Sequence, residues 1–125
     1  MIYGIGTDLV ETSRIARLLE KYGDRFARRL LTDEEWPDYL RSVRPAVFLA
    51  KRFAAKEALA KAFGTGVRYP VSLNHISISH DSLGKPYFRF HPALTMLAEN
   101  EGITRHHLSI SDELSLACAF VILEK

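Results

Sequence analysis

Small residues alternate with larger ones at the start of the chain, over positions 1–9. Gly4, Gly6 and Asp8 occupy one set of alternate positions, and larger residues such as Ile5 occupy the other. Because successive side chains of a strand point to opposite faces, this alternation predicts a strand. One face of the strand is unusually small and ends in the carboxylate of Asp8.

Apolar residues at helical spacing follow the strand, so we expect a first helix that Thr12 or Ser13 caps and that Gly23 ends. Two short helical stretches should come next. The first spans residues 25–31, and the second follows residues 32–35, whose sequence Thr-Asp-Glu-Glu has the form of a capping box. The segment between the first strand and Pro45 is therefore expected to be mostly helical.

The longest predicted helix runs from Pro45 to about Phe63. At 100° per residue, Arg52 and Lys56 fall inside its core-facing apolar sector, and Glu57 lies at the edge. A buried, unpaired charge costs several kcal/mol, so both cations need partners of opposite sign. Either they snorkel or form a structural ion pair with Glu57, or they line a pocket that holds an anionic ligand.

Strands predominate in the second half of the chain. Four are predicted, over residues 76–79, 87–90, 107–111 and 116–123. A helix should begin at Pro92, and the last two strands should be joined by a turn around Asp112 and Glu113. The order of strand, helices and then mostly strands favours an α+β fold with a mostly antiparallel sheet packed on the central helix.

Composition narrows the possible classes of protein. A chain of 125 residues has the usual size of one domain, and we expect a single domain over residues 1–125. The net charge of +2 is too small to imply a nucleic-acid partner. The single cysteine, Cys118, excludes an internal disulfide framework and a cysteine-built zinc site. The sequence contains no apolar run typical of a membrane span or signal peptide, so we expect a cytoplasmic protein without a membrane partner.

Asp8 is either a helix cap or a ligand. Because Thr12 and Ser13 are better placed to cap the first helix, the ligand interpretation gains weight. Two carboxylates on different elements, Asp8 and Glu57, suit Mg²⁺, which takes one or two protein carboxylates and completes its octahedron with water and phosphate oxygens. With the cations of the long helix, including Lys61, these acids would bind a metal-bound polyphosphate.

Two motifs carry a resemblance to a known family. At residues 6–11 (Gly-Thr-Asp-Leu-Val-Glu) and 52–58 (Arg-Phe-Ala-Ala-Lys-Glu-Ala), the sequence resembles the holo-acyl-carrier-protein synthases, the small bacterial 4′-phosphopantetheinyl transferases. Shorter matches extend the resemblance over nearly the whole chain, at residues 61–66, 83–86, 107–111 and 117–119. Several motifs in the correct order are a strong signal, although each motif alone is modest.

The resemblance implies a reaction in fatty acid biosynthesis. Members of this family move the phosphopantetheine arm of coenzyme A onto a serine hydroxyl of apo-acyl carrier protein and release adenosine 3′,5′-bisphosphate. Asp8 and Glu57 match the family's Mg²⁺ ligands. Such enzymes are typically homotrimers, with one active site at each subunit interface.

Five residues are expected to bind coenzyme A: Arg52, Lys56, Lys61, Gly64 and Thr65. Lys61 lies one helical turn after Glu57 and should contact phosphate, and glycine allows the backbone close approach. The planar fork of Arg52 could also meet a phosphate.

His107 is the candidate for substrate binding or proton transfer. A histidine on a strand is more often an ordinary partly buried residue, but His107 matches the family's histidine in a strand of the form His-x-Ser-x-Ser. Glu57 and a metal-bound water remain alternative bases. Many relatives have histidine where this chain has Asp112, so no function is assigned to that position.

Basic residues line one side of the first predicted helix, at Arg14, Arg17 and Lys21. A run of charges is normally a solvated face. In the family that this sequence resembles, the corresponding helix docks the acidic carrier protein, where opposite charge raises the encounter rate. Two other classes remain as alternatives: a small basic nucleic-acid-binding module, and a scaffold in which Asp8 and Glu57 belong to an inert buried network.

Overall fold

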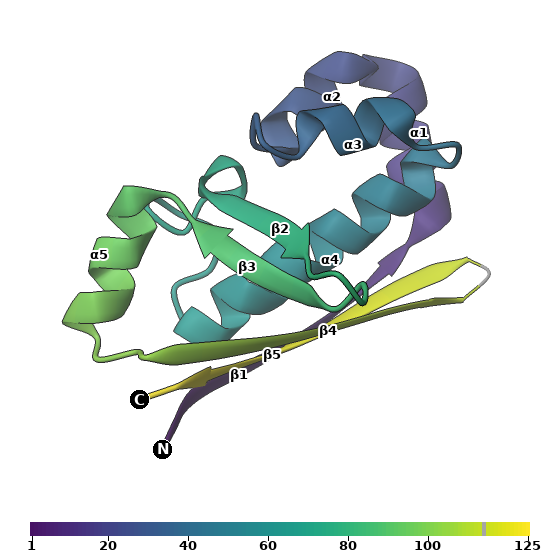
Figure 1. The fold of residues 1–125 in the computed structure, drawn as a ribbon. Helices are drawn as coiled ribbons and strands as arrows, with labels where there is room; N and C mark the ends of the chain where they lie inside the picture. Colours follow the sequence, from purple (N-terminus) through teal and green to yellow (C-terminus); the bar gives the residue numbers. More distant parts are fainter. Residues whose placement is uncertain (114) are drawn as a thin grey trace.

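A computed structural model describes residues 1–113 and 115–125 of the chain. The N-terminal half consists of β1 (Ile2–Glu11), α1 (Thr12–Tyr22), α2 (Asp24–Leu30), α3 (Trp36–Arg41) and α4 (Pro45–Phe63). The C-terminal half consists of a short 3₁₀ helix, η1 (Leu73–His75), followed by β2 (Ile76–His80), β3 (Pro86–Phe90), α5 (Pro92–Asn100), β4 (Arg105–Glu113) and β5 (Leu116–Glu124). In Figure 1, α4 packs on the long strands and runs roughly along them, α1–α3 cluster at one end, and α5 lies at the other.

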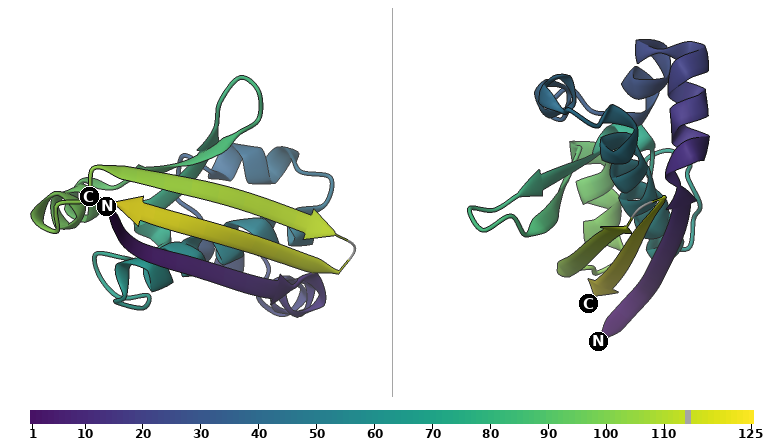
Figure 2. Two further views of the ribbon diagram at one scale, coloured as in Figure 1. Left: turned by 90° about the horizontal axis from the view of Figure 1, so that it is seen from below. Right: turned by 90° about the vertical axis from the view of Figure 1, so that its right-hand side faces the viewer.

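The strands form two antiparallel sheets rather than one. Three long strands lie in the order β1-β5-β4, and β2 pairs separately with β3. The β2–β3 hairpin projects from the rest of the chain (Figure 2), and Leu83 at its tip is almost fully exposed. The predicted α+β class with antiparallel strands is thus confirmed. No helix among the described residues is long and apolar enough to cross a membrane.

The small face of β1 packs directly on the backbone of α4. A Cβ atom added to Gly6 would lie 1.8 Å from the carbonyl oxygen of Ala58, and one added to Gly4 would lie 1.9 Å from that of Ala62. Real side chains never approach a backbone oxygen so closely. The glycines therefore let the strand touch the helix, and the next inward-facing side chain of β1, that of Asp8, points toward α4.

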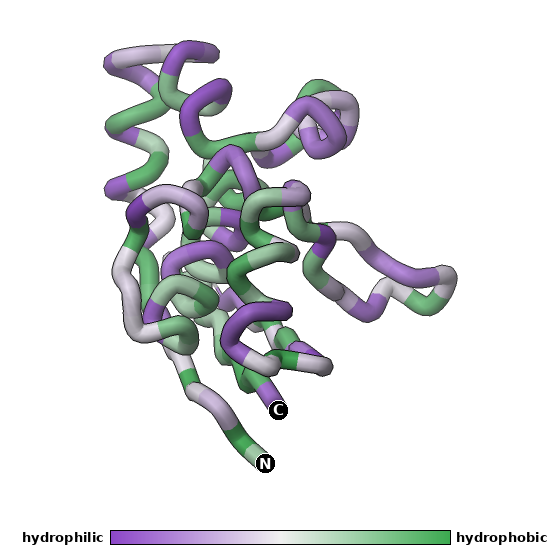
Figure 3. The backbone as a smooth tube through the Cα atoms, turned by 90° about the vertical axis from the view of Figure 1, so that its left-hand side faces the viewer, coloured by the Kyte–Doolittle hydropathy of each residue, from purple (hydrophilic) through white to green (hydrophobic). Residues whose placement is uncertain are grey.

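The helix α4 runs from Pro45 to Phe63 as predicted and ends at Gly64, whose φ of +79° favours glycine. The prediction of a single core-facing sector was wrong. Alanines on several sides of the helix, among them Ala50, Ala55 and Ala58, are fully buried, because the sheet covers one side and α1–α3 cover others. Figure 3 shows hydrophobic and hydrophilic residues mixed along the helical segments rather than separated.

Two expectations, one about the cap of α1 and one about the turn before β5, also differ from the structure. Neither Thr12 nor Ser13 caps α1, because both are already helical and Glu11 occupies the N-cap position without a side-chain hydrogen bond. The backbone N–H of Thr12 donates to the carbonyl oxygen of Ser115, 2.8 Å away. The turn expected at Asp112 and Glu113 was wrong too. Both residues belong to β4 and pair with the start of β5, and the connection includes residue 114, which lies outside the described residues.

Candidate functional site

Three polar side chains meet where β1 packs on α4. Asp8 comes from the inner face of β1, and its side chain is 16% exposed. Glu57 and Lys61 lie one turn apart on α4. The ammonium of Lys61 donates to Asp8 Oδ1 at 3.1 Å and to the carbonyl oxygen of Thr7 at 3.0 Å. The fold thus brings Asp8 to two residues of α4 that lie far from it in the sequence. The approach of Asp8 to Glu57 is the one predicted from the sequence.

The two carboxylates influence each other. Partial burial raises the pKa of Glu57, and the neighbouring Asp8 carboxylate raises it further. The positive charges of Lys61 and Arg14 act in the opposite direction. A partly buried pair of acids that share one neighbourhood favours the binding of a cation.

The donor set of this cluster fits Mg²⁺ rather than zinc. No group of three or more histidine, cysteine, aspartate and glutamate residues that could hold a metal occurs among residues 1–113 and 115–125. Such a group would be needed for a structural zinc site. Mg²⁺ differs because it binds through one or two carboxylates and fills its other positions with water and substrate phosphate oxygens. A cationic group, the ammonium of Lys61, already lies at Asp8.

Gly64 and Thr65 follow Lys61 at the C-terminal end of α4. The hydroxyl of Thr65 donates to the carbonyl oxygen of Gly66 at 2.8 Å, at an exposed position. Their predicted contact with coenzyme A stays a prediction, and their place beyond Lys61 on the same helix end is compatible with it.

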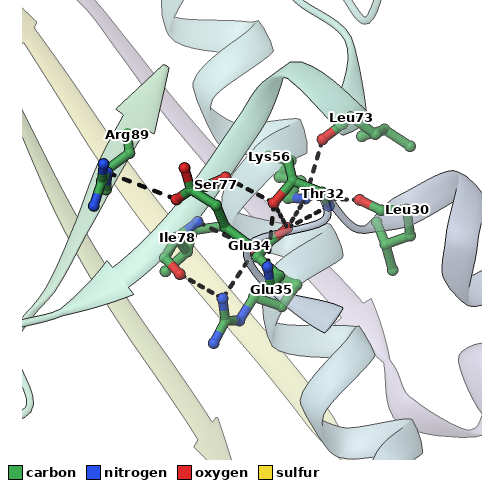
Figure 4. Close-up of polar contacts among 10 residues, drawn as sticks. Leu30, Thr32, Glu34, Glu35, Lys56, Leu73, Ser77, Ile78 and Arg89 are labelled. Atoms are coloured by element: carbon green, nitrogen blue, oxygen red, sulfur yellow. Dashed lines mark hydrogen bonds and ion pairs between the residues drawn. The ribbon is translucent and has the colours of Figure 1, made fainter. Parts of the chain in front are cut away.

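The other two predicted ligands of coenzyme A, Arg52 and Lys56, lie in a different environment. Both are buried, as expected, but their partner is Glu35 rather than Glu57 (Figure 4). Glu35 Oε2 accepts from Arg52 at 2.9 Å and from the backbone N–H of Ile78 at 3.1 Å. An ion pair with Glu57, one of the alternatives that the sequence left open, is therefore wrong, because the α2–α3 connection brings another carboxylate into the interior.

Lys56 is enclosed completely. Its side chain is 0% exposed, and its ammonium donates to Glu35 Oε1 at 2.6 Å and to the carbonyl oxygens of Leu30 at 2.6 Å and Leu73 at 3.0 Å. With all three N–H donors used inside the protein, Lys56 has none left for a phosphate. The structure thus favours the alternative of a structural ion network for this lysine and for its neighbour Arg52.

Glu35 was missed as a member of this network, although the sequence contained a signal. The capping box predicted at 32–35 is present, since the N–H of Thr32 donates to Glu35 Oε1 at 3.0 Å and the N–H of Glu35 donates to Thr32 Oγ1 at 3.3 Å. A capping-box glutamate normally lies at the surface end of a helix. Here the same carboxylate also faces two buried cations.

The charges in this network change the proton affinities of its members. Burial lowers the pKa of Lys56 from an ordinary value of 10.5 to about 8, despite the opposing effect of Glu35. Burial alone would raise the pKa of Glu35, but the charges and hydrogen bonds of Lys56, Thr32 and Arg52 lower it below its ordinary value.

Stability should therefore depend on pH through Lys56. Because its pKa is lower in the folded than in the unfolded chain, the unfolded chain keeps this proton to higher pH, and folding gains stability as pH rises above about 8. The free energy of unfolding of the wild type minus that of Lys56→Met should increase by at most about 1.4 kcal/mol per pH unit between roughly pH 8 and pH 10. Urea titrations at several pH values measure this difference, and a constant difference would contradict the prediction.

His107 lies away from the acidic cluster within one chain. It belongs to the outward-facing set of β4 residues with Ser109 and Ser111, and its Nε2 atom lies 2.5 Å from Glu124. The cluster of Asp8 lies on the other face of the same sheet, against α4. One chain therefore does not bring His107 to the two acids, and its catalytic role stays a prediction.

The basic face of α1 is solvent-exposed. Arg14, Arg17 and Lys21 are all exposed, and Arg14 also lies over the ring of Phe53 on α4. Arg14 is close enough to the cluster to lower the pKa of Glu57. Arg14 of this basic face thus lies beside the acidic pair, and Arg17 and Lys21 follow it along α1.

A second site-like feature was not predicted. A cavity of about 350 Å³ lies between α4 and the β2–β3 hairpin and is lined in part by Lys51, Arg52 and His80. Asp112, to which the sequence gave no role, lines it as well and lies 3.6 Å from the ammonium of Lys51. No pattern in the sequence joins these residues, because they come from three elements that only the fold brings together.

Comparisons with known proteins identify the family and support the fold. The model of the 4′-phosphopantetheinyl transferase superfamily matches residues 4–119. The holo-[acyl-carrier-protein] synthase of Nitrosospira multiformis is 82% identical over 125 residues, which is the full length of both chains. Among solved structures, the holo-[acyl-carrier-protein] synthase of Neisseria meningitidis is 54% identical with a TM-score of 0.97 and full coverage of both chains. A Bacillus anthracis synthase in complex with CoA (3′,5′-ADP) is 38% identical with a TM-score of 0.82, covering 98% of this chain and 96% of that one.

Proposed function

This chain belongs to the 4′-phosphopantetheinyl transferase superfamily, and we propose that it makes holo-acyl carrier protein. It transfers the phosphopantetheine arm of coenzyme A to a serine hydroxyl of the apo-carrier and releases adenosine 3′,5′-bisphosphate. The observation that carries this proposal is the cluster of Asp8, Glu57 and Lys61, which come from three separate segments that match the family. The nucleic-acid-binding alternative has no support among the relatives.

The acidic pair is proposed to hold Mg²⁺. When bound, this ion neutralises charge on the diphosphate of coenzyme A and holds it in place for attack. Phosphoryl transfer asks the protein mainly to position the reactants and to stabilise charge on phosphate oxygens. Asp8 and Glu57 supply negative charge for the ion, and Lys61 supplies N–H donors for a phosphate. Gly64 and Thr65 offer backbone that a phosphate can approach closely.

We further propose that the protein acts as a homotrimer with its sites between subunits. The sheet face opposite α4 supports this association, because it exposes large apolar side chains: Ile5 is 54% exposed, Leu9 63% and Phe120 43%. His107 lies on the same face, so in a trimer the His107 side chain of one subunit could reach the substrate bound to the next subunit. Sedimentation analysis of the wild type and of Phe120→Asp tests this, since the charged variant should dissociate.

The exposed basic face of α1 is proposed to receive the acidic carrier protein. Reversing two of its charges in Arg17→Glu/Lys21→Glu should raise KM for apo-carrier roughly tenfold and leave KM for coenzyme A unchanged, because the lost attraction acts on encounter. The control is Lys125→Glu, which reverses a charge just after β5, beside Met1 and away from α1. Steady-state kinetics at several salt concentrations measure both effects, and equal KM values for the α1 variant and the control would contradict the docking surface.

The reaction itself is tested by mass spectrometry of apo-acyl carrier protein incubated with this protein, coenzyme A and Mg²⁺. A mass gain equal to the phosphopantetheine arm, absent when a chelator is added, supports the proposal. We place this reaction in the cytoplasm, in fatty acid biosynthesis, and assign it to the chain as one domain. An unchanged carrier mass in the presence of Mg²⁺ would refute the transfer.

A further inference from the structure

Two lysines of α4 hold their positive charges in different ways. The ammonium of Lys56 is fully buried and uses its three donors on three interior acceptors. The side chain of Lys61 is 54% exposed, and its ammonium contacts two acceptors, both on β1: Asp8 Oδ1 at 3.1 Å and the carbonyl oxygen of Thr7 at 3.0 Å. Lys56 is therefore fixed in place, whereas Lys61 can leave its partners for solvent or for a ligand.

A cation at Asp8 meets an electrostatic need of the free protein. Asp8 and Glu57 are both partly buried and lie near each other, so their negative charges repel. The ammonium of Lys61 offsets part of this repulsion through its contact with Asp8. A divalent ion held by the two carboxylates would meet the same need with twice the charge. Lys61 and the metal ion therefore compete for Asp8.

We propose that Lys61 is a placeholder cation whose ammonium occupies Asp8 in the free protein and moves to the diphosphate of coenzyme A when a divalent cation binds. This inference rests on the proposed function and adds an order of events to it. The flexible four-carbon stem of lysine permits the exchange. A metal ion that arrives alone must displace Lys61 from Asp8 and offers it no new partner, whereas coenzyme A supplies one. Metal and coenzyme A should consequently each strengthen the binding of the other.

The test is Mn²⁺ binding to the free protein, followed by electron paramagnetic resonance of the unbound ion at fixed pH and low salt. Lys61→Gln should bind Mn²⁺ roughly three- to tenfold more tightly than the wild type, since no ammonium competes for Asp8. Lys125→Gln removes one positive charge far from the cluster and should bind like the wild type. Coenzyme A should tighten Mn²⁺ binding to the wild type more than to Lys61→Gln, after correction for Mn²⁺ bound by coenzyme A in buffer. Circular dichroism and thermal melting confirm that each variant is folded.

The outcomes separate this inference from the proposed function. Equal or weaker Mn²⁺ binding by Lys61→Gln overturns the placeholder role, and the metal site itself stands if Asp8→Asn still abolishes binding. If neither the wild type nor Lys61→Gln binds Mn²⁺, with or without coenzyme A, the placeholder role and the Mg²⁺ dependence both fail. The mass gain of apo-carrier, measured on the same samples, then shows whether the transfer proceeds without a metal.

Discussion

Replacing Asp8 or Glu57 with its amide should lower the rate of phosphopantetheine transfer on the order of a thousandfold, because metal stabilisation of developing charge contributes several kcal/mol. Asp8→Asn and Glu57→Gln preserve size and can still accept hydrogen bonds, so packing between β1 and α4 should change little. Removal of either charge also relieves the repulsion between the two acids. Activity is therefore expected to fall without a matching loss of stability. Initial rates of carrier modification and urea unfolding of the same samples measure both quantities.

The matched control is Glu99→Gln, which neutralises an exposed acid on α5. It should retain transfer activity close to that of the wild type. The scaffold alternative predicts the reverse pattern for the acidic pair, namely a lower melting temperature and normal activity in the folded fraction. Near-normal transfer by both Asp8→Asn and Glu57→Gln would remove the basis for the metal site.

Truncation of Glu35 should destabilise the protein by about 3–5 kcal/mol, because it leaves two buried cations without their carboxylate. Arg52 and Lys56 both contact Glu35, and all three side chains are less than 7% exposed. Glu35 also accepts the backbone N–H of Ile78 and so joins β2 to α4. The free energy of unfolding of Glu35→Ala, obtained from urea titration, should show this loss.

The neighbouring residue offers a close control. Glu34 is exposed, and its carboxylate lies 3.7 Å from the guanidinium of Arg89, which is also exposed. An exposed ion pair contributes about 1 kcal/mol or less, so Glu34→Ala should change the free energy of unfolding by no more than that. If Glu35→Ala were as stable as Glu34→Ala, the buried network would not be a main support of the fold. Should Glu35→Ala fail to fold, Glu35→Gln keeps one oxygen for the capping hydrogen bond and measures the loss of the charge together with the acceptor for Arg52 and Ile78.

Local patterns were sufficient for most of the helices and strands. Alternation around Gly4 and Gly6 predicted a strand with a small face, and the structure explains that face by contact with the α4 backbone. Proline and glycine marked both ends of α4, since one fixes the first turn and the other adopts the left-handed conformation beyond the last turn. These signals act within a few residues, so they can be recognised without the fold.

Features that depend on distant partners were not predictable in the same way. Lys56 and Glu35 are 21 positions apart, and no periodicity indicates that the α2–α3 connection folds back onto α4. The start of α1 also depends on a distant residue, because the backbone N–H of Thr12 donates to the carbonyl oxygen of Ser115, which is far away in the sequence. The helical periodicity of α4 predicted that Arg52 and Lys56 are buried, but the only acid it could offer as a partner was the nearby Glu57.

The residues of the candidate site also differ in how far the sequence predicts their positions. Asp8 and Glu57 were expected to converge, and the contact of β1 with α4 brings them together with Lys61. Arg52 and Lys56 were expected beside them but belong to the interior network. His107 lies on the opposite face of the sheet, so its role depends on an assembly that one chain does not specify.

The most direct test of the metal site is a crystal structure of the protein with Mn²⁺ and coenzyme A, in which anomalous scattering locates the ion. We predict one strong Mn²⁺ peak bound by the carboxylates of Asp8 and Glu57 and by oxygens of the diphosphate, and no peak at that position in crystals of Asp8→Asn. A peak that contacts the diphosphate but neither carboxylate would contradict the account.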